Sequence, residues 1–392
     1  MNIRAAKSIQ AQRVATILVT CLAWTLSAGR PCTAVETVAF TLHGTHREVS
    51  GKILIEAADG GLLLEGPDRQ IWVLQPADIE RRTSNDEEFT YATRAEVEAT
   101  VLRELPPGFK VHNTAHYMIC YNTTRAYAQW CGALYERLYG AYFNFWRKRG
   151  LKLTEPDFLV SIVFRDGGSY ATYGQPEVGD AVASVIGFYS PATNRIATQD
   201  LTGIEQVRQP GDRTGSLRHI NAILSRPGAE RTVATLIHEA THQLAFNSGL
   251  QVRYADNPLW LCEGLAIYFE APDLSSNKGW RKIGAMHPLR LQTWRANQAA
   301  RPADALLRLL TDDSQFRQVA TAEQAYSEAW ALCYYLINQR SDEFRNYLTT
   351  IGQKPVLSDD SPETRVQEFQ QAFGGSWRDI DASWRRAADS WR

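Results

Sequence analysis

The chain has 392 residues, of which 42 are basic and 43 are acidic, so its formal net charge is −1 at pH 7. A balance this close to neutrality gives no overall field that would attract nucleic acid or an anionic membrane, and it argues against nucleic acid as a partner. Hydrophobic residues make up 44% of the chain and charged residues 22%. This composition is globular, and the length is enough for two or three packed units.

The first 34 residues have the order of a secretory signal peptide. Three basic residues precede an apolar run over residues 14–26, and small residues follow at Ser27 and Ala28. Cleavage after Ala28 or after Ala34 fits this pattern, and an uncleaved anchor is the alternative. No later stretch is long and apolar enough to span a bilayer. We therefore expect a protein that is secreted or lies in the periplasm or cell envelope, with no membrane span after the signal segment.

Cleavage after Ala34 would leave an even number of cysteines, which suits disulfides in an oxidising compartment: Cys120, Cys131, Cys262 and Cys333. Three pairings are possible, and the sequence does not choose among them. The short loop between Cys120 and Cys131 favours that pair. The alternative is four buried free thiols.

Residues 35–83 are predicted to form a small β unit. Four short β-prone runs are separated by turns that contain glycine, and they cover residues 38–42, 51–56, 61–65 and 70–74. Four strands of this length suggest a little barrel or sandwich, which we interpret as an adaptor rather than a catalytic module. The stretch 81–88 is polar and charged throughout, which suits a linker, and we assign residues 84–100 to that linker.

Residues 101–230 are predicted to form the α/β upper lobe of a second domain. The expected elements are strands within 110–121, an aromatic-rich helix over 124–148, a buried strand over 158–164 and a hairpin of 184–189 with 194–199. Residues 201–230 form a long loop with a short helix near 217–224, and such loops are often lids or walls of active sites. His112 and His116 share one side of a strand without an acidic third ligand, so we interpret them as packing or surface residues.

The most specific chemistry lies in His238-Glu239-Ala240-Thr241-His242, which has the form H-E-x-x-H. Apolar residues recur at steps of three and four through residues 231–246, which is typical of a helix. Histidines four apart on a helix share a face, so their nitrogens can converge on one metal ion. Glu239 is turned by about 100° from His238 and can act on a bound water without being a ligand.

A second helix, predicted over residues 256–272, carries Glu263. Asp256 or Asn257 is expected as its N-cap. A carboxylate from a second helix about twenty residues downstream completes a set of two histidines and one glutamate, and it leaves a fourth position open for water, as catalytic zinc requires. The pattern therefore predicts one Zn²⁺ per chain.

The two helices resemble the gluzincin branch of the thermolysin-like metallopeptidases, especially secreted bacterial proteins with a peptidase-MA-like domain, many of unassigned function. The resemblance rests on H-E-x-x-H and on Trp260-Leu-x-Glu263-Gly-x-Ala266-x-Tyr268, and in outline it covers residues 105–390. It implies an α+β fold in which a small all-β module precedes a domain with a mixed sheet, an active-site helix and a mostly helical lobe over 231–392.

The resemblance also implies roles for individual residues. His238, His242 and Glu263 would bind the metal, and Glu239 would be the general base. One strand of the 184–199 hairpin would lie over the metal and pair with an extended substrate, and an internal hairpin is the alternative. Tyr326, near the start of a helix, would donate a hydrogen bond to the oxyanion, whereas the alternative is a half-buried packing tyrosine.

Two further residues are candidates beside the metal. Glu270 lies seven residues after Glu263 and hence on the same face, where it could orient a ligand histidine, and a solvated helix carboxylate is the alternative. His287 could be a stabilising group, and the alternative is a histidine of a loop or helix start. We interpret Tyr334 and Tyr335 as packing residues.

The sequence therefore predicts a secreted zinc metallopeptidase that hydrolyses peptide bonds in a peptide or protein substrate. One alternative is a catalytically silent gluzincin-fold scaffold that binds partners or supports the envelope. The presence of Glu239 argues against it, since a metal scaffold does not need that side chain. The other alternative is a zinc amidase that acts on a cell-wall substrate. Nothing in the sequence indicates an oligomeric state.

Overall fold

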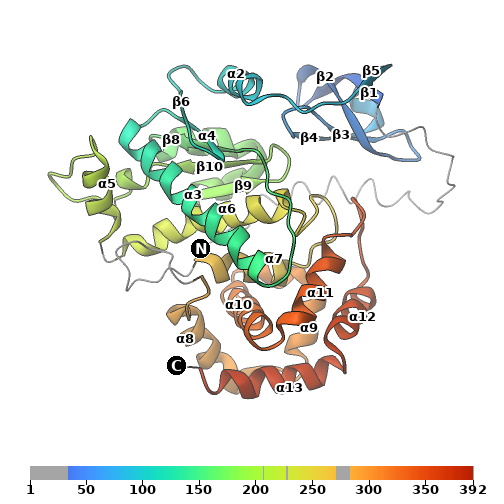
Figure 1. Cartoon of the computed structure of the whole chain (residues 1–392), viewed down its shortest axis with the longest axis vertical. Helices are drawn as coiled ribbons and strands as arrows, with labels where there is room; N and C mark the ends of the chain where they lie inside the picture. Colours follow the sequence, from blue (N-terminus) through green and yellow to red (C-terminus); the bar gives the residue numbers. More distant parts are fainter. Residues whose placement is uncertain (1–33, 206, 227, 271–282, 392) are drawn as a thin grey trace.

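The computed structural model describes residues 34–391, apart from residues 206, 227 and 271–282. The predicted signal segment lies outside the described residues, except for Ala34, which begins strand β1. The chain forms an N-terminal sheet, a second sheet flanked by helices, and a helical C-terminal part (Figure 1). The predicted α+β class is confirmed. Among the described residues, every helix is too short or too polar to cross a membrane.

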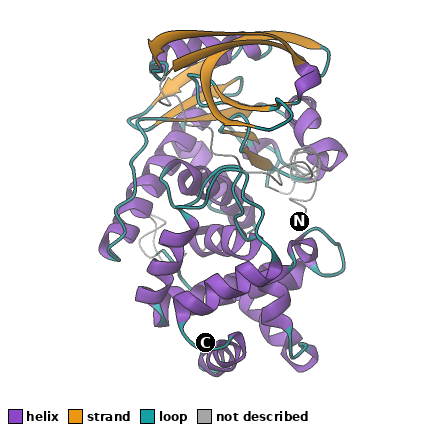
Figure 2. Ribbon diagram, turned by 90° about the vertical axis from the view of Figure 1, so that its right-hand side faces the viewer, coloured by secondary structure: helices purple, strands orange, loops and turns teal. Residues whose placement is uncertain are grey.

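The N-terminal sheet has five strands in the order β4-β3-β2-β1-β5, with all neighbours antiparallel. The strands are β1 (Ala34–Leu42), β2 (Thr45–Glu56), β3 (Leu62–Glu65), β4 (Ile71–Leu74) and β5 (Ile79–Glu88). Alternate residues of β1, Val38 and Phe40, meet Leu62 and Leu64 of β3 in a small core. The sheet is curved (Figure 2), and β4 and β5 are its edges, so it is an open sheet rather than a closed barrel.

Most of the predicted linker, residues 84–100, is regular structure. Strand β5 covers its first part, and helix α2 (Arg94–Glu104) covers most of the rest. The polar composition of this stretch predicted a linker, because it contains few apolar side chains that could be buried in a core. An edge strand needs little burial, because its backbone pairs with one neighbour while its side chains remain in water. Arg82 of β5 adds ion pairs with Glu36 and Glu56.

The second sheet has the order β6-β7-β8-β10-β9. Its strands are β6 (Lys110–Asn113), β7 (Tyr117–Tyr121), β8 (Leu159–Phe164), β9 (Gly187–Ser190) and β10 (Arg195–Gln199). Strand β8 pairs in parallel with β7 and β10, whereas β6 and β9 are antiparallel edge strands, so the sheet is mixed, as predicted. Helix α3 (Arg125–Lys148), the expected aromatic helix, packs on one face, and α2 and α4 (Gly167–Val178) cover the other.

The disulfide suggested between Cys120 and Cys131 is wrong, because all four described cysteines are free and buried. Successive side chains of a strand point to opposite faces of its sheet. On β7, Cys120 faces α2 and α4, whereas Cys131 of α3 packs against the other face, so the sheet separates the two thiols. Burial also raises the pKa of Cys120 to about 12, which keeps this thiol protonated and unreactive.

Of the remaining α-helices, α5 and α6 lie beside the second sheet, and the others form the lower part of the molecule in Figure 1. These remaining helices are α5 (Leu217–Leu224), α6 (Ala229–Asn247), α7 (Leu259–Glu270), α8 (Pro288–Asn297), α9 (Ala305–Thr311), α10 (Ala322–Gln339), α11 (Ser341–Ile351), α12 (Pro362–Phe373) and α13 (Trp377–Ala388). Helices α6 and α7 are the two predicted motif helices. The start of α7 differs from the prediction, since the Leu259 N–H donates to the Asp313 carboxylate. Asp256 instead pairs with Lys354 and Arg365.

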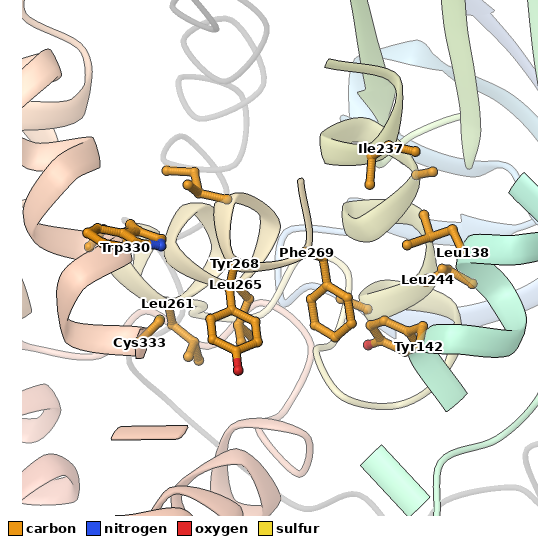
Figure 3. Packing of buried hydrophobic residues seen from close by; sticks show 14 of the residues in the cluster. Leu138, Tyr142, Ile237, Leu244, Leu261, Leu265, Tyr268, Phe269, Trp330 and Cys333 are labelled. Atoms are coloured by element: carbon orange, nitrogen blue, oxygen red, sulfur yellow. The ribbon is translucent and has the colours of Figure 1, made fainter. Parts of the chain in front are cut away.

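Helix α7 lies between α6 and α10, and all of its side chains are buried. In Figure 3, Phe269 faces Tyr142 of α3 on one side, while Leu261 lies beside Cys333 of α10 on the other. At Gly264 the two backbones almost touch, because a Cβ there would lie 2.4 Å from the Ala329 carbonyl oxygen. The position of α7, and of the glutamates that it carries, is thus fixed from both sides.

We expect Gly264→Ala to lower the free energy of unfolding by roughly 1–3 kcal/mol or more, since α7 and α10 must separate to admit the methyl group. Gly140→Ala is the matched control. Gly140 lies inside α3, and its added Cβ would meet nothing within 4 Å, so this change should stabilise the protein by about 0.5–1 kcal/mol. Denaturant unfolding of both variants tests the contact, and equal effects would contradict it.

Candidate metal centre

Two helices bring the three predicted ligands together. His238 and His242 are four residues apart on α6, and Glu263 is on α7. His238 Nε2 lies 3.1 Å from His242 Nε2 and 3.1 Å from Glu263 Oε2, and His242 Nε2 lies 3.7 Å from the same oxygen. All three side chains are buried. They form a group that could hold one metal ion, and the described residues contain no second cluster of this kind.

The spacing of these donor atoms fits a small metal ion. Ligand atoms in a tetrahedral zinc site lie about 2.0–2.1 Å from the ion, and hence about 3.3 Å from one another. The separations of 3.1 and 3.7 Å bracket that value. Two imidazoles and one carboxylate also make a donor set that divalent transition metals accept. The residues present therefore fit a metal ion in both geometry and chemistry.

The electrostatics of the group favour a cation. Burial by itself lowers the pKa of His238, but hydrogen bonds and charge interactions with Glu263 and Glu270 outweigh it and raise that pKa to about 10. Two buried carboxylates thus face two imidazoles. Buried carboxylates are costly unless a positive charge compensates them, and a divalent ion between the ligands would do so.

Glu270 lies behind the ligands. Its Oε2 is 2.8 Å from His238 Nδ1, the ring nitrogen on the far side from His242 and Glu263. Burial raises the pKa of Glu270, but hydrogen bonds with His238 and His287 lower it to about 2, so the group is a carboxylate. A carboxylate here keeps the proton on Nδ1 and leaves Nε2 to face a cation. Glu270 therefore has the orienting position, not that of a solvated helix carboxylate.

His287 starts a helix and also lies beside the candidate centre. It is the N-cap of α8, where its Nδ1 accepts a hydrogen bond from the Arg290 N–H at 3.3 Å. Its Nε2 lies 3.6 Å from Glu270 Oε1. The histidine that starts α8 is thus linked through Glu270 to the ligand His238.

Glu239 is not among the three converging groups. Its Oε2 accepts a hydrogen bond of 2.8 Å from the backbone N–H of Tyr189, and its side chain is buried. Tyr189 belongs to β9, the edge strand of the second sheet. The carboxylate next to the ligand His238 is therefore oriented by a backbone group of the sheet edge.

A cavity of about 890 Å³ adjoins this group and includes His238, Glu239 and Glu270 in its lining. One wall is residues 185–187, so β9 is the strand of the hairpin that borders the site. The other walls come from the first half of α6, from α8 and from the start of α10, where Tyr326 lines the cavity. None of the described residues of the predicted loop 201–230 lines this cavity.

The wall formed by α8 was missed by sequence reasoning. The His287-Pro288 pair was a visible signal for a helix start, since proline is favoured at the first helical position. Nothing in the sequence placed that helix across from α6. The other histidine pair lies away from the site, and His116 stacks on Tyr139 at 3.8 Å and bonds Glu136, which agrees with a packing role.

The N-terminal sheet supports the β9–β10 hairpin from outside. Between the two strands, the carbonyl of Pro191 accepts a hydrogen bond of 3.1 Å from Arg253, which also donates to the Arg69 carbonyl at 2.8 Å. The Ile71 N–H of β4 donates to the Ala192 carbonyl at 2.7 Å. The turn of the hairpin is thus bonded to the first sheet, which restrains the strand that holds Glu239.

With Zn²⁺ as the probe ion, we expect Glu270→Ala to weaken metal binding about 10–100-fold, because His238 would lose the acceptor that fixes its ring. Glu323→Ala is the control, since Glu323 lines the same cavity and contacts Thr293 rather than a ligand. Competition with a chelator of known affinity measures the change. Equal zinc affinity of Glu270→Ala and the unchanged protein would show that Glu270 does not support the centre.

A family model described as a protein of unknown function, DUF1570, matches residues 232–358. This segment is about a third of the chain, and it contains the three converging ligands, Glu239 and Tyr326. No curated protein matches the sequence. The chain is therefore similar to this family over the segment that carries the candidate metal centre.

Proposed function

We propose that the protein is a zinc-dependent hydrolase that cleaves peptide bonds. The observation that carries this proposal is the convergence of His238, His242 and Glu263 beside a cavity that His238 and Glu239 line. A structural metal site needs no acid–base residue and is usually closed by a fourth protein ligand. The combination of three ligands, a separate carboxylate and a cavity favours catalysis.

Zn²⁺ is the proposed ion because two histidines and a glutamate are a ligand set of catalytic zinc. The relation to the thermolysin-like gluzincins belongs to the same proposal. It is supported by the order of elements, in which a mixed sheet with an antiparallel edge strand precedes the two motif helices. The predicted signal segment supports an exported enzyme, acting in the periplasm or cell envelope or outside the cell.

Each residue of the site has a separate role in the proposed reaction. A bound zinc ion would polarise the scissile carbonyl and acidify a water molecule. Glu239 accepts the proton of that water and delivers it to the leaving amine, and the Tyr189 N–H keeps one of its oxygens in place. Glu270 holds His238 in the orientation that a ligand needs. Tyr326 stabilises the negative charge that develops on the carbonyl oxygen.

The edge of the sheet supports a peptide as substrate. The Tyr189 N–H points to Glu239 and hence away from β10. In a strand, the backbone N–H and C=O groups of alternate residues point to the same side. The backbone groups of Gly187 therefore face the same side, where Gly187 lines the cavity. An extended peptide can add to such an edge through main-chain hydrogen bonds.

We expect one zinc ion per chain in the mature protein, no bound zinc in Glu263→Ala, and bound zinc with strongly reduced turnover in Glu239→Gln. The last variant retains all ligands and loses the base, so its kcat on a cleaved peptide should fall roughly 10²–10⁴-fold. Metal analysis and a peptide hydrolysis assay measure the two quantities. Unchanged hydrolysis by Glu239→Gln would refute the mechanism, and zinc without hydrolysis of any peptide would favour the scaffold.

We expect Tyr326→Phe to lower kcat about 10²-fold while KM and zinc content stay within twofold, because the hydroxyl acts only as charge develops. Tyr334→Phe on the same helix is the control. Its ring packs on Trp391 and Trp330, and its hydroxyl has no proposed part in the reaction. A Tyr326→Phe enzyme as active as this control would remove Tyr326 from the mechanism.

A further inference from the structure

We propose that the guanidinium of Arg290 binds a carboxylate of the substrate, so that the enzyme selects peptides with an acidic group close to the scissile bond. The proposal rests on the proposed function and names the substrate class for the same cavity. The carboxylate has two possible sources, which are an aspartate or glutamate side chain and the free C-terminus of the peptide.

Arg290 is held in the cavity wall by three contacts. Its backbone N–H is bonded to the cap residue His287 at 3.3 Å, and its carbonyl accepts a hydrogen bond of 2.6 Å from Ser327. Its guanidinium lies 5.5 Å from the centre of the Tyr326 ring. The backbone of Arg290 is thus fixed by two elements and its side chain by an aromatic face, which lowers the entropy lost when it binds a ligand.

The charge of Arg290 acts close to the candidate metal centre. The Arg290 N–H is bonded to His287, whose Nε2 lies 3.6 Å from Glu270 Oε1, next to the predicted ligand His238. Arg290 and the proposed oxyanion donor Tyr326 line the same cavity. A group bound by Arg290 would therefore lie next to the reacting carbonyl, where it can influence which peptides are cleaved.

Arg290 differs from the buried arginines of the fold. Arg195 and Arg301 each pair with two carboxylates: Glu104 and Asp68 for the first, Glu328 and Asp381 for the second. The charges of those arginines are compensated by carboxylates of the chain. In the part of the chain that the structure describes, Arg290 forms no ion pair. Its donors are available to a ligand.

A carboxylate is the anion that fits this position best in a peptide substrate. The planar guanidinium matches its two oxygens with a pair of parallel hydrogen bonds. Arg231 of α6 also lines the cavity, so a second cation adds to the attraction. The carboxylate Glu323 lines it too, but it is exposed and lies beside Thr293, at 3.4 Å from that hydroxyl.

The test measures binding of acetylated octapeptide pools to the full mature chain loaded with zinc and carrying Glu239→Gln, so that nothing is hydrolysed. Two pools carry glutamate or glutamine at central positions and end in an amide. Two others lack acidic residues and end in a free carboxylate or an amide. In one of the two pairs, we expect the pool with the carboxylate to bind about tenfold more tightly than the pool without it. The pair that shows this difference identifies whether the carboxylate is a side chain or the C-terminus.

The preference should vanish in Arg290→Gln, persist in part in Arg290→Lys, and fall only slightly in Arg231→Gln, since Arg231 adds attraction without pairing with the carboxylate. Unchanged zinc content and thermal unfolding would show that Arg290→Gln is folded. Equal binding of both members in both pairs overturns the proposal, and so does a preference that survives Arg290→Gln. Wild-type hydrolysis is assayed separately. A preference that depends on Arg290 without any hydrolysis would support the carboxylate site and reject the proposed hydrolase.

Discussion

The structure depends on the burial of Glu263 and Glu270 in a helix whose every side chain is enclosed. Taking a carboxylate out of water costs several kcal/mol unless a partner compensates it. Among the described residues, the partners of these two include the histidines of α6, with His287 at the edge of the group. The packing of α7 on α6 therefore depends on the contacts between these carboxylates and histidines. If either helix moved, a buried charge would lose its partner inside an apolar core.

The residues of the centre could be predicted because they lie on two helices with strong local signals. Helical spacing placed His238 and His242 on one face, and a seven-residue step placed Glu270 on the face of Glu263. These relations hold within a helix regardless of the surrounding fold. What the sequence could not supply was the contact between helices, such as the approach of His287 to Glu270.

The incorrect predictions also have a physical basis. The polar composition of β5 predicted a linker, because composition indicates how many side chains can be buried. An edge strand is held instead by backbone pairing with one neighbour. The pair Cys120 and Cys131 was favoured by closeness in sequence, but the alternation of side chains on β7 sends one thiol to each face of the sheet. In both cases a tertiary arrangement overrode a local pattern.

The hydrogen bonds of Arg253 and Ile71 to the hairpin turn limit how the chain can be cut into fragments that fold. A fragment that starts after the first sheet would contain every residue of the candidate metal centre, yet the turn of its edge hairpin would face water instead of β4. In the intact protein, the two sheets should therefore unfold together in a single thermal transition. The N-terminal sheet therefore braces the hairpin that borders the candidate metal centre.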